Sequence, residues 1–212
     1  MDPYQITFES WDKVAKKYQE VFMDFELYND SYDLFLTTLP EPNATILEIG
    51  CGPGNITSYL LNKKPTLDIE AYDIAPSMIE LAKINNPTAT FGVLDAREIQ
   101  TLSSLYDAIL CGFCLPYLAN NDVSQFIHDS YKLLQPNGIL YLSTLEGDYE
   151  TSGYISGSTG DQMYVYYHSE TTLRTMLSKH SFELIEIIRK PYSRADGSQE
   201  IHLIIIAKKI CD

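Results

Sequence analysis

The sequence predicts a single α/β domain built on a mainly parallel β-sheet. Apolar runs alternate, for most of the chain, with segments of helical periodicity, and this alternation is typical of repeated β-α-β units. The runs expected to form strands are residues 45–49, 67–73, 90–94, 106–111, 138–144, 182–189 and 201–207. The chain of 212 residues is 45% hydrophobic, which is enough to bury one sizeable core.

Two helices are expected before the first strand. Residues 8–25 show helical periodicity, and residues 29–39 are expected to form a second helix. Together they should form a cap over the edge of the sheet where open α/β folds bind their ligands.

Local capping and turn residues mark the elements that follow. Helix starts are indicated by Ser77 after Pro76, by Asn121 and Asp122 before segment 123–134, and by Ser169 before segment 170–179. The segment QPNG at 135–138 indicates a helix stop and a turn. The last two strands are separated only by KPYSRADGSQ, which leaves no room for a crossover helix, so we expect an antiparallel hairpin.

The charge balance limits the partners. The formal net charge is −14, and no cluster of Lys and Arg stands out against it, so nucleic acid and anionic membranes are not expected to bind. The first residues do not resemble a secretory signal, and the longest late apolar run, 203–207, is far too short to span a bilayer. We therefore expect a cytoplasmic protein.

The four cysteines predict reduced thiols and no metal site. Cys51, Cys111, Cys114 and Cys211 are too few for a secreted disulfide framework. Cys111 and Cys114 have the spacing of a redox pair, but Leu115 and Pro116 follow them where a thioredoxin-like site would open a helix. Two cysteines also cannot complete a structural zinc site. We interpret both as small apolar residues.

A glycine loop follows the first strand, and its spacing is E-x-G-x-G-x-G. A dinucleotide fingerprint would carry Gly or Ala at the position of Asn55, the sixth position when Gly50 is counted as the first. Glu48 would be unfavourable beside pyrophosphate but favourable beside an ammonium group. Asp73 ends the second strand, where an acid can accept both hydroxyls of a ribose. The pattern favours a ligand with a ribose and a cationic amino-acid end.

Five motifs in this order resemble the class I S-adenosylmethionine-dependent methyltransferases, specifically the small-molecule branch typified by ubiquinone- and biotin-pathway enzymes. They are ILEIGCGPG, EAYDIAPSMIELAK, GVLDAREI, YDAILCGFCLPYL and LLQPNGILYLS. The resemblance runs from about residue 8 to the C-terminus. It implies a Rossmann-like three-layer αβα sandwich with strand order 3-2-1-4-5-7-6 and strand seven antiparallel, in agreement with the expected terminal hairpin.

The resemblance also implies a set of site residues. Around the methionine part of S-adenosylmethionine it places Glu48, Gly50, Cys51, Gly52 and Gly54, with Gly112 and Phe113 beneath and Tyr18 of the cap above. Around the nucleoside it places Asp73 on the ribose and Ile74, Met78, Leu94, Asp95 and Ala96 beside the adenine. Structural interpretations compete: Glu48 could cap a backbone group, Asp73 and Asp95 could start turns, and Met78 could pack in the core.

Methyl transfer from a sulfonium is an in-line displacement, so the protein must chiefly align the acceptor and exclude water. A general base is needed only for some acceptors. The candidates are His168, which could equally be a surface residue before a helix cap, and Tyr117 after the fourth strand. His128 is expected to be solvated, and His180 and His202 are expected near the distal end of the fold. The segment 146–168 is long for its position and predicts a substrate lid, lined by Tyr149, Tyr154, Tyr164, Tyr166 and Tyr167.

We therefore expect one methyltransferase domain acting on a small organic acceptor, as a monomer or homodimer. Its parts would be a cap at 1–43, a cofactor-binding core at 44–145, the lid at 146–168, and a terminal helix and hairpin at 169–212. The absence of an Asn/Asp-Pro-Pro-Tyr motif argues against amide targets. The alternatives are a non-catalytic S-adenosylmethionine-binding module, since fold alone does not specify reaction, and a nicotinamide oxidoreductase, which the glycine spacing disfavours.

Overall fold

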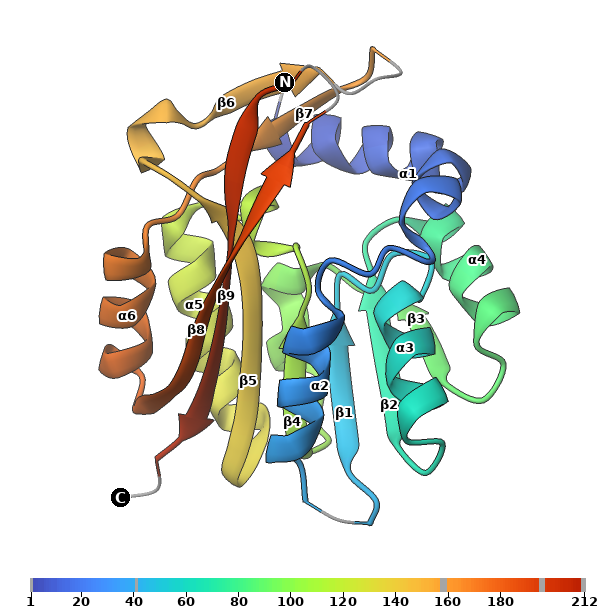
Figure 1. Ribbon diagram of the computed structural model, residues 1–212, viewed down its shortest axis with the longest axis vertical. Coiled ribbons are helices and arrows are strands. Elements are labelled where there is room, and N and C mark those ends of the chain that lie inside the picture. Colours follow the sequence, from blue (N-terminus) through green and yellow to red (C-terminus); the bar gives the residue numbers. More distant parts are fainter. Residues whose placement is uncertain (1, 41, 157–159, 195–196, 211–212) are drawn as a thin grey trace.

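The structure, a computed structural model, describes residues 2–40, 42–156, 160–194 and 197–210. Seven strands form one sheet in the order β3-β2-β1-β4-β5-β9-β8 (Figure 1). Their bounds are β1 (Thr45–Ile49), β2 (Asp68–Asp73), β3 (Thr90–Val93), β4 (Tyr106–Cys111), β5 (Leu134–Glu146), β8 (Phe182–Ser193) and β9 (Gln199–Lys209). The first five strands run parallel and β9 is antiparallel to both neighbours. The predicted sheet order and terminal hairpin are confirmed.

Helices cover both faces of the sheet, and each face has its own apolar core. The helices are α1 (Pro3–Phe22), α2 (Asn29–Thr38), α3 (Asn55–Lys63), α4 (Pro76–Asn85), α5 (Asn120–Leu133) and α6 (Glu170–Lys179). Buried residues of α2, α3 and α4 pack on one face, and those of α5 and α6 pack on the other. Along β4, Ala108 and Leu110 enter the first core while Ile109 and Cys111 enter the second, because side chains alternate along a strand.

Several boundaries differ from those expected. Helix α1 begins at Pro3 rather than at residue 8, because Asp2 caps it by accepting a hydrogen bond from the Tyr4 amide at 3.1 Å. The predicted turn at 135–138 lies within β5. The strand is irregular there, because Asn137 has a φ of 64° and the register against β4 shifts. Strands β8 and β9 are longer than expected and extend into the loop predicted between them. Residues 195–196 of that loop lie outside the described part of the chain.

The expected lid segment forms a small antiparallel sheet of β6 (Gly153–Ser156) and β7 (Gln162–Val165), which the sequence did not predict. Residues 157–159 between the two strands lie outside the described residues. Figure 1 shows this sheet and α1 together above the carboxyl ends of the parallel strands. Ser10 donates to the Gln162 carbonyl at 2.6 Å, and the Tyr164 amide donates to Thr7 Oγ1 at 3.0 Å. Helix α1 and the β6–β7 sheet thus form one connected layer, whereas α2, which we expected to share the cap, packs on a face of the main sheet.

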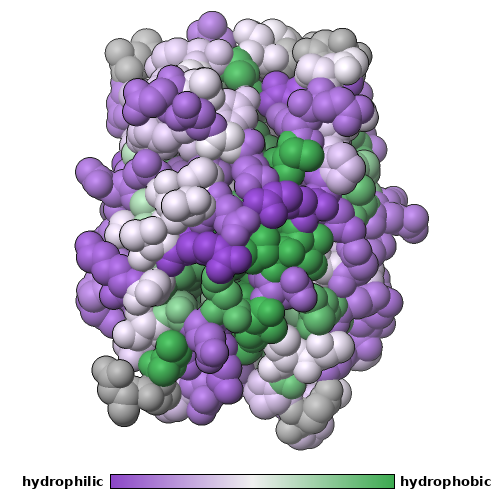
Figure 2. Space-filling view, turned by 60° about the vertical axis from the view of Figure 1, so that its left-hand side comes forward, coloured by the Kyte–Doolittle hydropathy of each residue, from purple (hydrophilic) through white to green (hydrophobic). Residues whose placement is uncertain are grey.

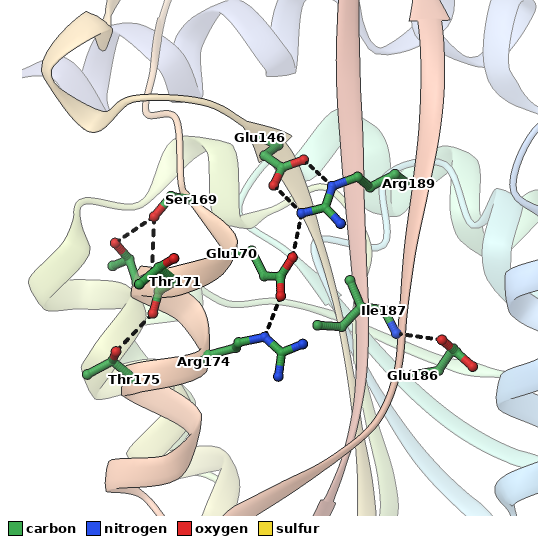
Figure 3. Close-up of polar contacts among 10 residues, drawn as sticks. Glu146, Ser169, Glu170, Thr171, Arg174, Thr175, Glu186, Ile187 and Arg189 are labelled. Atoms are coloured by element: carbon green, nitrogen blue, oxygen red, sulfur yellow. Dashed lines mark hydrogen bonds and ion pairs between the residues drawn. The ribbon is translucent and has the colours of Figure 1, made fainter.

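An ion-pair network fixes the point where the chain returns from the β6–β7 sheet to the main sheet. The guanidinium of Arg189 on β8 binds both carboxylate oxygens of Glu146 at the end of β5, each at 2.7 Å (Figure 3). It also pairs with Glu170 at the start of α6, which pairs in turn with Arg174. Bidentate pairing restricts orientation as well as distance, so three elements are held in one arrangement.

The edge strand β8 is partly apolar. Its Ile185 is 41% exposed, and Figure 2 shows, on the side that lies to the left in Figure 1, apolar surface bordered by hydrophilic residues. The same strand carries Glu183, Glu186, Arg189 and Lys190. Charged side chains on an edge strand discourage pairing with another sheet.

Replacing Leu110 with Ala should lower the free energy of unfolding by about 2–5 kcal/mol, because the side chain is fully buried in the centre of the sheet and its loss leaves a cavity. The matched control is Ile84→Ala on α4, where the side chain is 76% exposed and the change should stay within about 0.5 kcal/mol. Urea unfolding followed by circular dichroism measures both values. Equal unfolding midpoints for the two variants would contradict this description of the core.

Candidate functional site

The glycine loop lies at the carboxyl end of β1 and requires its glycines. Gly50, Gly52 and Gly54 have φ values of 72°, 53° and 81°, a region in which residues with a side chain are strained. A Cβ atom on Gly50 would lie 2.7 Å from Cys114 Cβ, and one on Gly54 would lie 2.4 Å from Asn86 Nδ2. The loop therefore keeps its backbone close to the neighbouring chain and leads directly into α3.

Hydrogen bonds from the loop to the end of β2 hold it in place. The amides of Gly50 and Cys51 donate to the Tyr72 carbonyl at 2.8 and 3.0 Å. The next amide, that of Gly52, donates to Asp73 Oδ2 at 2.9 Å, and Asp73 Oδ1 accepts from the Ala75 amide at 2.9 Å. Burial raises the pKa of Asp73, and these amides oppose that effect. Asp73 keeps free lone pairs on both oxygens with which to accept ribose hydroxyls.

Glu48 is a buried carboxylate with one unpaired oxygen. Its Oε2 accepts a hydrogen bond from Thr57 at 2.5 Å, whereas Oε1 has no hydrogen-bond partner within the described residues. Burial raises the pKa of Glu48 to about 8, and the charge of Asp73 adds to the effect. An unpaired buried acceptor is costly, and a ligand ammonium would supply its missing donor. The site fits the amino-acid end of S-adenosylmethionine.

Aromatic residues of α1 cover the loop. Tyr18 Cε1 lies 3.5 Å from the position of a Cβ on Gly52, and burial, together with the charges of Asp73 and Glu48, raises the pKa of its hydroxyl. The indole of Trp11 packs edge-on against Tyr18, with 5.3 Å between the ring centroids. Its Nε1 is buried and has no hydrogen-bond partner among the residues that the structure describes, so it is an unused donor on the cap. The sequence interpretation missed Trp11, although it is the single tryptophan of the chain.

The residues expected around the adenine are present at one edge, but some have other partners. Met78 is buried with Ala15, Ala75 and the ring of Trp11, which is the packing role of the competing interpretation; Ile74 is half-buried beside it. The carboxylate of Asp95 pairs with Arg97 at 2.6 Å, flanked by the half-buried Leu94 and the buried Ala96. An adenine that donates to Asp95 must share this acceptor with Arg97.

Gly112 and Phe113 lie at the end of β4, on the opposite side of the loop. A Cβ on Gly112 would lie 2.3 Å from Ile56 Cδ1, so a side chain there would require Ile56 to move. Phe113 has a φ of 55° and its amide donates to Ser143 Oγ at 2.8 Å. Its ring packs against Tyr28 and His202, with centroid distances of 4.8 and 4.9 Å.

The described cysteines are free thiols. Cys51 and Cys111 are buried and Cys114 is half-buried. The pKa of Cys114 is raised mainly by a hydrogen bond with Cys111 and also by burial. Burial raises the pKa of Cys51. Raised pKa values keep the thiols protonated, which disfavours redox chemistry. Cys211 lies outside the described residues. No group of three or more metal-binding side chains occurs in the described part of the chain.

The geometry does not support His168 as a base. The residue is fully buried, and its Nδ1 and Nε2 are each 3.0 Å from an oxygen, of Asn120 and of the Leu115 carbonyl respectively. Burial lowers its pKa. Both ring nitrogens thus have partners within the protein, and His168 joins the lid segment to the chain after β4. It also lines a cleft of about 410 Å³ with Tyr149 and Tyr167, to which no residue of the glycine loop contributes.

Tyr117 lies beside the cap, where its ring packs edge-on against Trp11 at 5.4 Å. Burial raises its pKa, and Tyr18 and Cys114 add to the effect. A buried phenol without a basic partner stays protonated at neutral pH. The role of Tyr117 at the acceptor stays a prediction, and no structural observation assigns it the function of a base.

The tyrosines expected to line the lid pack mainly on one another. The rings of Tyr164 and Tyr166 lie 4.7 Å apart, Tyr149 stacks on Tyr166 at 5.9 Å, and Tyr154 packs edge-on against Tyr164 at 5.0 Å. Tyr4 of the cap extends the same cluster. These contacts join the lid to α1, which stabilises a cover over the site.

His202 contradicts the expected position near the distal end. Since β9 is antiparallel to β5, its first residues lie beside the carboxyl end of that strand, and His202 pairs with Leu145 in the register. Its ring therefore contacts Phe113, at the ligand-binding edge. The direction of the last strand was the feature that could have located it. His180 lies at the far end of α6, as expected.

None of the described helices is long and apolar enough to cross a membrane.

Comparison with known proteins identifies the family. A family model described as a methyltransferase domain matches residues 18–187. A malonyl-[acyl-carrier protein] O-methyltransferase of Acetivibrio thermocellus is 31% identical over 65% of this chain and 44% of its own, and a ubiquinone biosynthesis O-methyltransferase of Bartonella tribocorum is 25% identical over 82% and 76%. The chain spans less than half the length of several of the curated relatives it matches.

Solved structures agree with the fold. Magnesium protoporphyrin IX methyltransferase from Synechocystis, solved with S-adenosylmethionine bound, superposes with a TM-score of 0.74 at 16% identity over 99% of this chain and 98% of its own. A methyltransferase from Methanosarcina mazei gives a TM-score of 0.72 at 22% identity over 84% and 98%. The sheet order, the glycine loop and the family match together show that this chain belongs to the class I S-adenosylmethionine-dependent methyltransferases.

Proposed function

We propose that the protein transfers a methyl group from S-adenosylmethionine to a small organic acceptor by in-line displacement. The observation that carries this proposal is the buried oxygen of Glu48, unpaired within the described residues, beside a glycine loop with positive φ values. Such an acceptor suits the ammonium of an amino-acid ligand and would be unfavourable beside a phosphate. No observation favours the non-catalytic module over an enzyme.

S-adenosylmethionine supplies, when bound, an electrophilic methyl group on a sulfonium. Glu48 and the loop amides would hold its amino-acid end, and Asp73 would accept from the ribose hydroxyls. Tyr18 and Trp11 cover the loop, so they would exclude water and limit the approach of the acceptor to one direction. No nucleophile on the enzyme is required.

A small acceptor agrees with the charge and the covering layer. A chain with a net charge of −14 repels nucleic acid, and the α1 and β6–β7 layer stands over the ligand-binding edge, where it would obstruct a macromolecule (Figure 1). The ubiquinone biosynthesis and magnesium protoporphyrin IX relatives are named for small molecules. A cytoplasmic location, a monomeric or homodimeric state and the division of the chain into cap, core, lid and terminal parts remain predictions.

Replacing Asp73 with Ala should weaken S-adenosylhomocysteine binding by about one to two orders of magnitude, because two charge-assisted hydrogen bonds to the ribose would be lost. Titration calorimetry measures the dissociation constants of both proteins. Asp68→Ala, an exposed position at the other end of β2, is the matched control and should bind as the wild type does. NAD should not bind. A wild type that fails to bind S-adenosylhomocysteine would remove the basis of the proposal.

Binding should also depend on pH through Glu48. Because its pKa in the free protein is about 8, the carboxyl is largely protonated at pH 6, whereas an ammonium ligand binds the ionised form. Binding therefore releases a proton, and affinity for S-adenosylhomocysteine should rise between pH 6 and 8 by up to about tenfold per unit. Glu48→Gln should bind more weakly and show no such rise. A wild-type affinity that is constant over this range would contradict the role of Glu48.

The acceptor class can be tested with S-adenosylmethionine labelled in its methyl group. Label should pass to members of a metabolite panel and not to tRNA, DNA or protein, because the site lies under a cover and the chain is acidic. Asp73→Ala is the control that should lose most of the transfer. Label found in a macromolecule while the metabolite panel stays inert would refute the small-acceptor assignment.

A further inference from the structure

A series of hydrogen-bonded side chains links Tyr28, before α2, to the terminal hairpin. Tyr28, which precedes α2, has its hydroxyl 2.6 Å from His202 Nδ1. The opposite ring nitrogen, Nε2, lies 3.0 Å from Glu200 Oε1, and Glu200 Oε2 accepts from Arg194 Nε at 2.7 Å. Tyr28 and His202 are 8% and 5% exposed, so these bonds form largely away from water.

The neighbours determine the direction of the hydrogen bonds. Burial alone would raise the pKa of Glu200, but hydrogen bonds from His202 and Arg194 outweigh it and lower that pKa, so the group is a carboxylate that can only accept. His202 must therefore carry its proton on Nε2, which leaves Nδ1 as an acceptor for the Tyr28 hydroxyl. Burial, with Tyr18 and Tyr192 adding to it, raises the pKa of Tyr28, so the phenol is protonated and needs a base to accept a proton from elsewhere.

This series lies at the methionine end of the site. Phe113, which ends the cofactor-facing turn after β4, contacts both Tyr28 and His202. Tyr192 stacks on His202 at 4.7 Å. Cys114, the residue after Phe113, lies against the glycine loop, since a Cβ on Gly50 would be 2.7 Å from its Cβ. The hydrogen-bonded side chains therefore contact the same turn after β4 that contacts the glycine loop.

We propose that Tyr28, His202 and Glu200 form a proton relay that deprotonates the methyl acceptor. The inference rests on the proposed methyltransferase function and adds to it a catalytic residue, Tyr28, two positioning residues, His202 and Glu200, and a class of acceptor. That class is a molecule that carries a hydroxyl or N–H group at the methylated atom. A carboxylate acceptor has no proton to lose, so its methylation would not require the relay.

The proton passes along these residues in steps and is finally released to solvent. The acceptor's O–H or N–H proton moves to Tyr28 Oη, while the Tyr28 proton moves to His202 Nδ1. The resulting imidazolium keeps its Nε2 proton on Glu200, whose negative charge stabilises it. The electron pair left on the acceptor atom forms the new bond to carbon. Solvent later removes the proton from His202, since the outcome of each cycle is the net release of one proton.

The surrounding groups leave Nδ1 with one partner. On the adjacent strand, Lys190 is opposite His202 in the register, but it pairs with Asp30 of α2. Tyr192 contributes a ring face to His202 rather than a hydrogen bond. The rings of Phe25 and Phe113 pack against the Tyr28 ring, and Tyr192 packs against Phe25, so an acceptor beside Tyr28 would meet aromatic rings, which suits a planar molecule.

The first test uses two cofactor analogues and needs no known acceptor. Sinefungin carries an amine in place of the sulfonium methyl, so it presents a donor toward the relay, whereas S-adenosylhomocysteine presents nothing there. Tyr28→Phe should lower sinefungin affinity by at least about tenfold, the effect of one hydrogen bond to a charged group, and change S-adenosylhomocysteine affinity less than about twofold. Tyr131→Phe, at the opposite end of the sheet, is the matched control and should change neither.

A second test uses the wild type, so it does not depend on the folding of a variant. Long-range ¹H–¹⁵N spectra of the protein labelled at its four histidines, assigned with His202→Gln, report which ring nitrogen carries the proton. At pH 7 with S-adenosylhomocysteine bound, His202 should be protonated on Nε2 alone, and exchange for sinefungin should shift its Nδ1 resonance. Thermal unfolding checks that each variant is folded.

Three results would overturn the relay: an equal loss of both analogues in Tyr28→Phe, a proton on His202 Nδ1, or an Nδ1 resonance that does not respond to sinefungin. Each of them can occur in a protein that binds S-adenosylhomocysteine normally, and then only the relay fails. A wild type that binds neither analogue overturns the proposed function itself, and the relay with it. The two failures are therefore distinguishable.

Discussion

The hydrogen bonds from the Gly50 and Cys51 amides to the Tyr72 carbonyl fix the glycine loop to the second strand, and the site is arranged around that loop. They hold it in a left-handed conformation that only glycine adopts without strain, and they bring Gly52 onto Asp73. Because the loop is held in this way, a carboxylate at Glu48 can be buried beneath it with one oxygen unpaired. A ligand donor offsets the cost of that burial, which makes the site selective for a cationic group.

The cover of the site is built from aromatic residues of two distant parts of the chain. Helix α1 places Trp11 and Tyr18 on the loop, and the β6–β7 sheet packs its tyrosines against the same helix. Rings supply large contact areas with few rotatable bonds, so such a cover orders at low entropic cost. The network of Arg189 with Glu146 and Glu170 holds the base of this cover to the main sheet.

The antiparallel last strand has a consequence for chemistry. In a purely parallel sheet every strand would bring its carboxyl end to the ligand, whereas β9 brings its first residues there. The hairpin can thereby deliver Glu200 and His202 to an edge that the preceding strands reach with loops. These two residues thereby meet the phenol of Tyr28, although Tyr28 and His202 are 174 positions apart in the sequence.

The sequence was enough to predict the alternation of strands and helices and the terminal hairpin, from local periodicity and loop length, and its five family motifs implied the sheet order that the structure confirms, whereas the cofactor residues that the same motifs imply stay predictions. It could not decide the partners of side chains that meet only in the folded protein. His168 is enclosed between Asn120 and Leu115, Met78 packs beneath α1, and His202 faces Phe113 rather than the distal end. Such contacts depend on strand direction, register and burial, which tertiary structure alone sets.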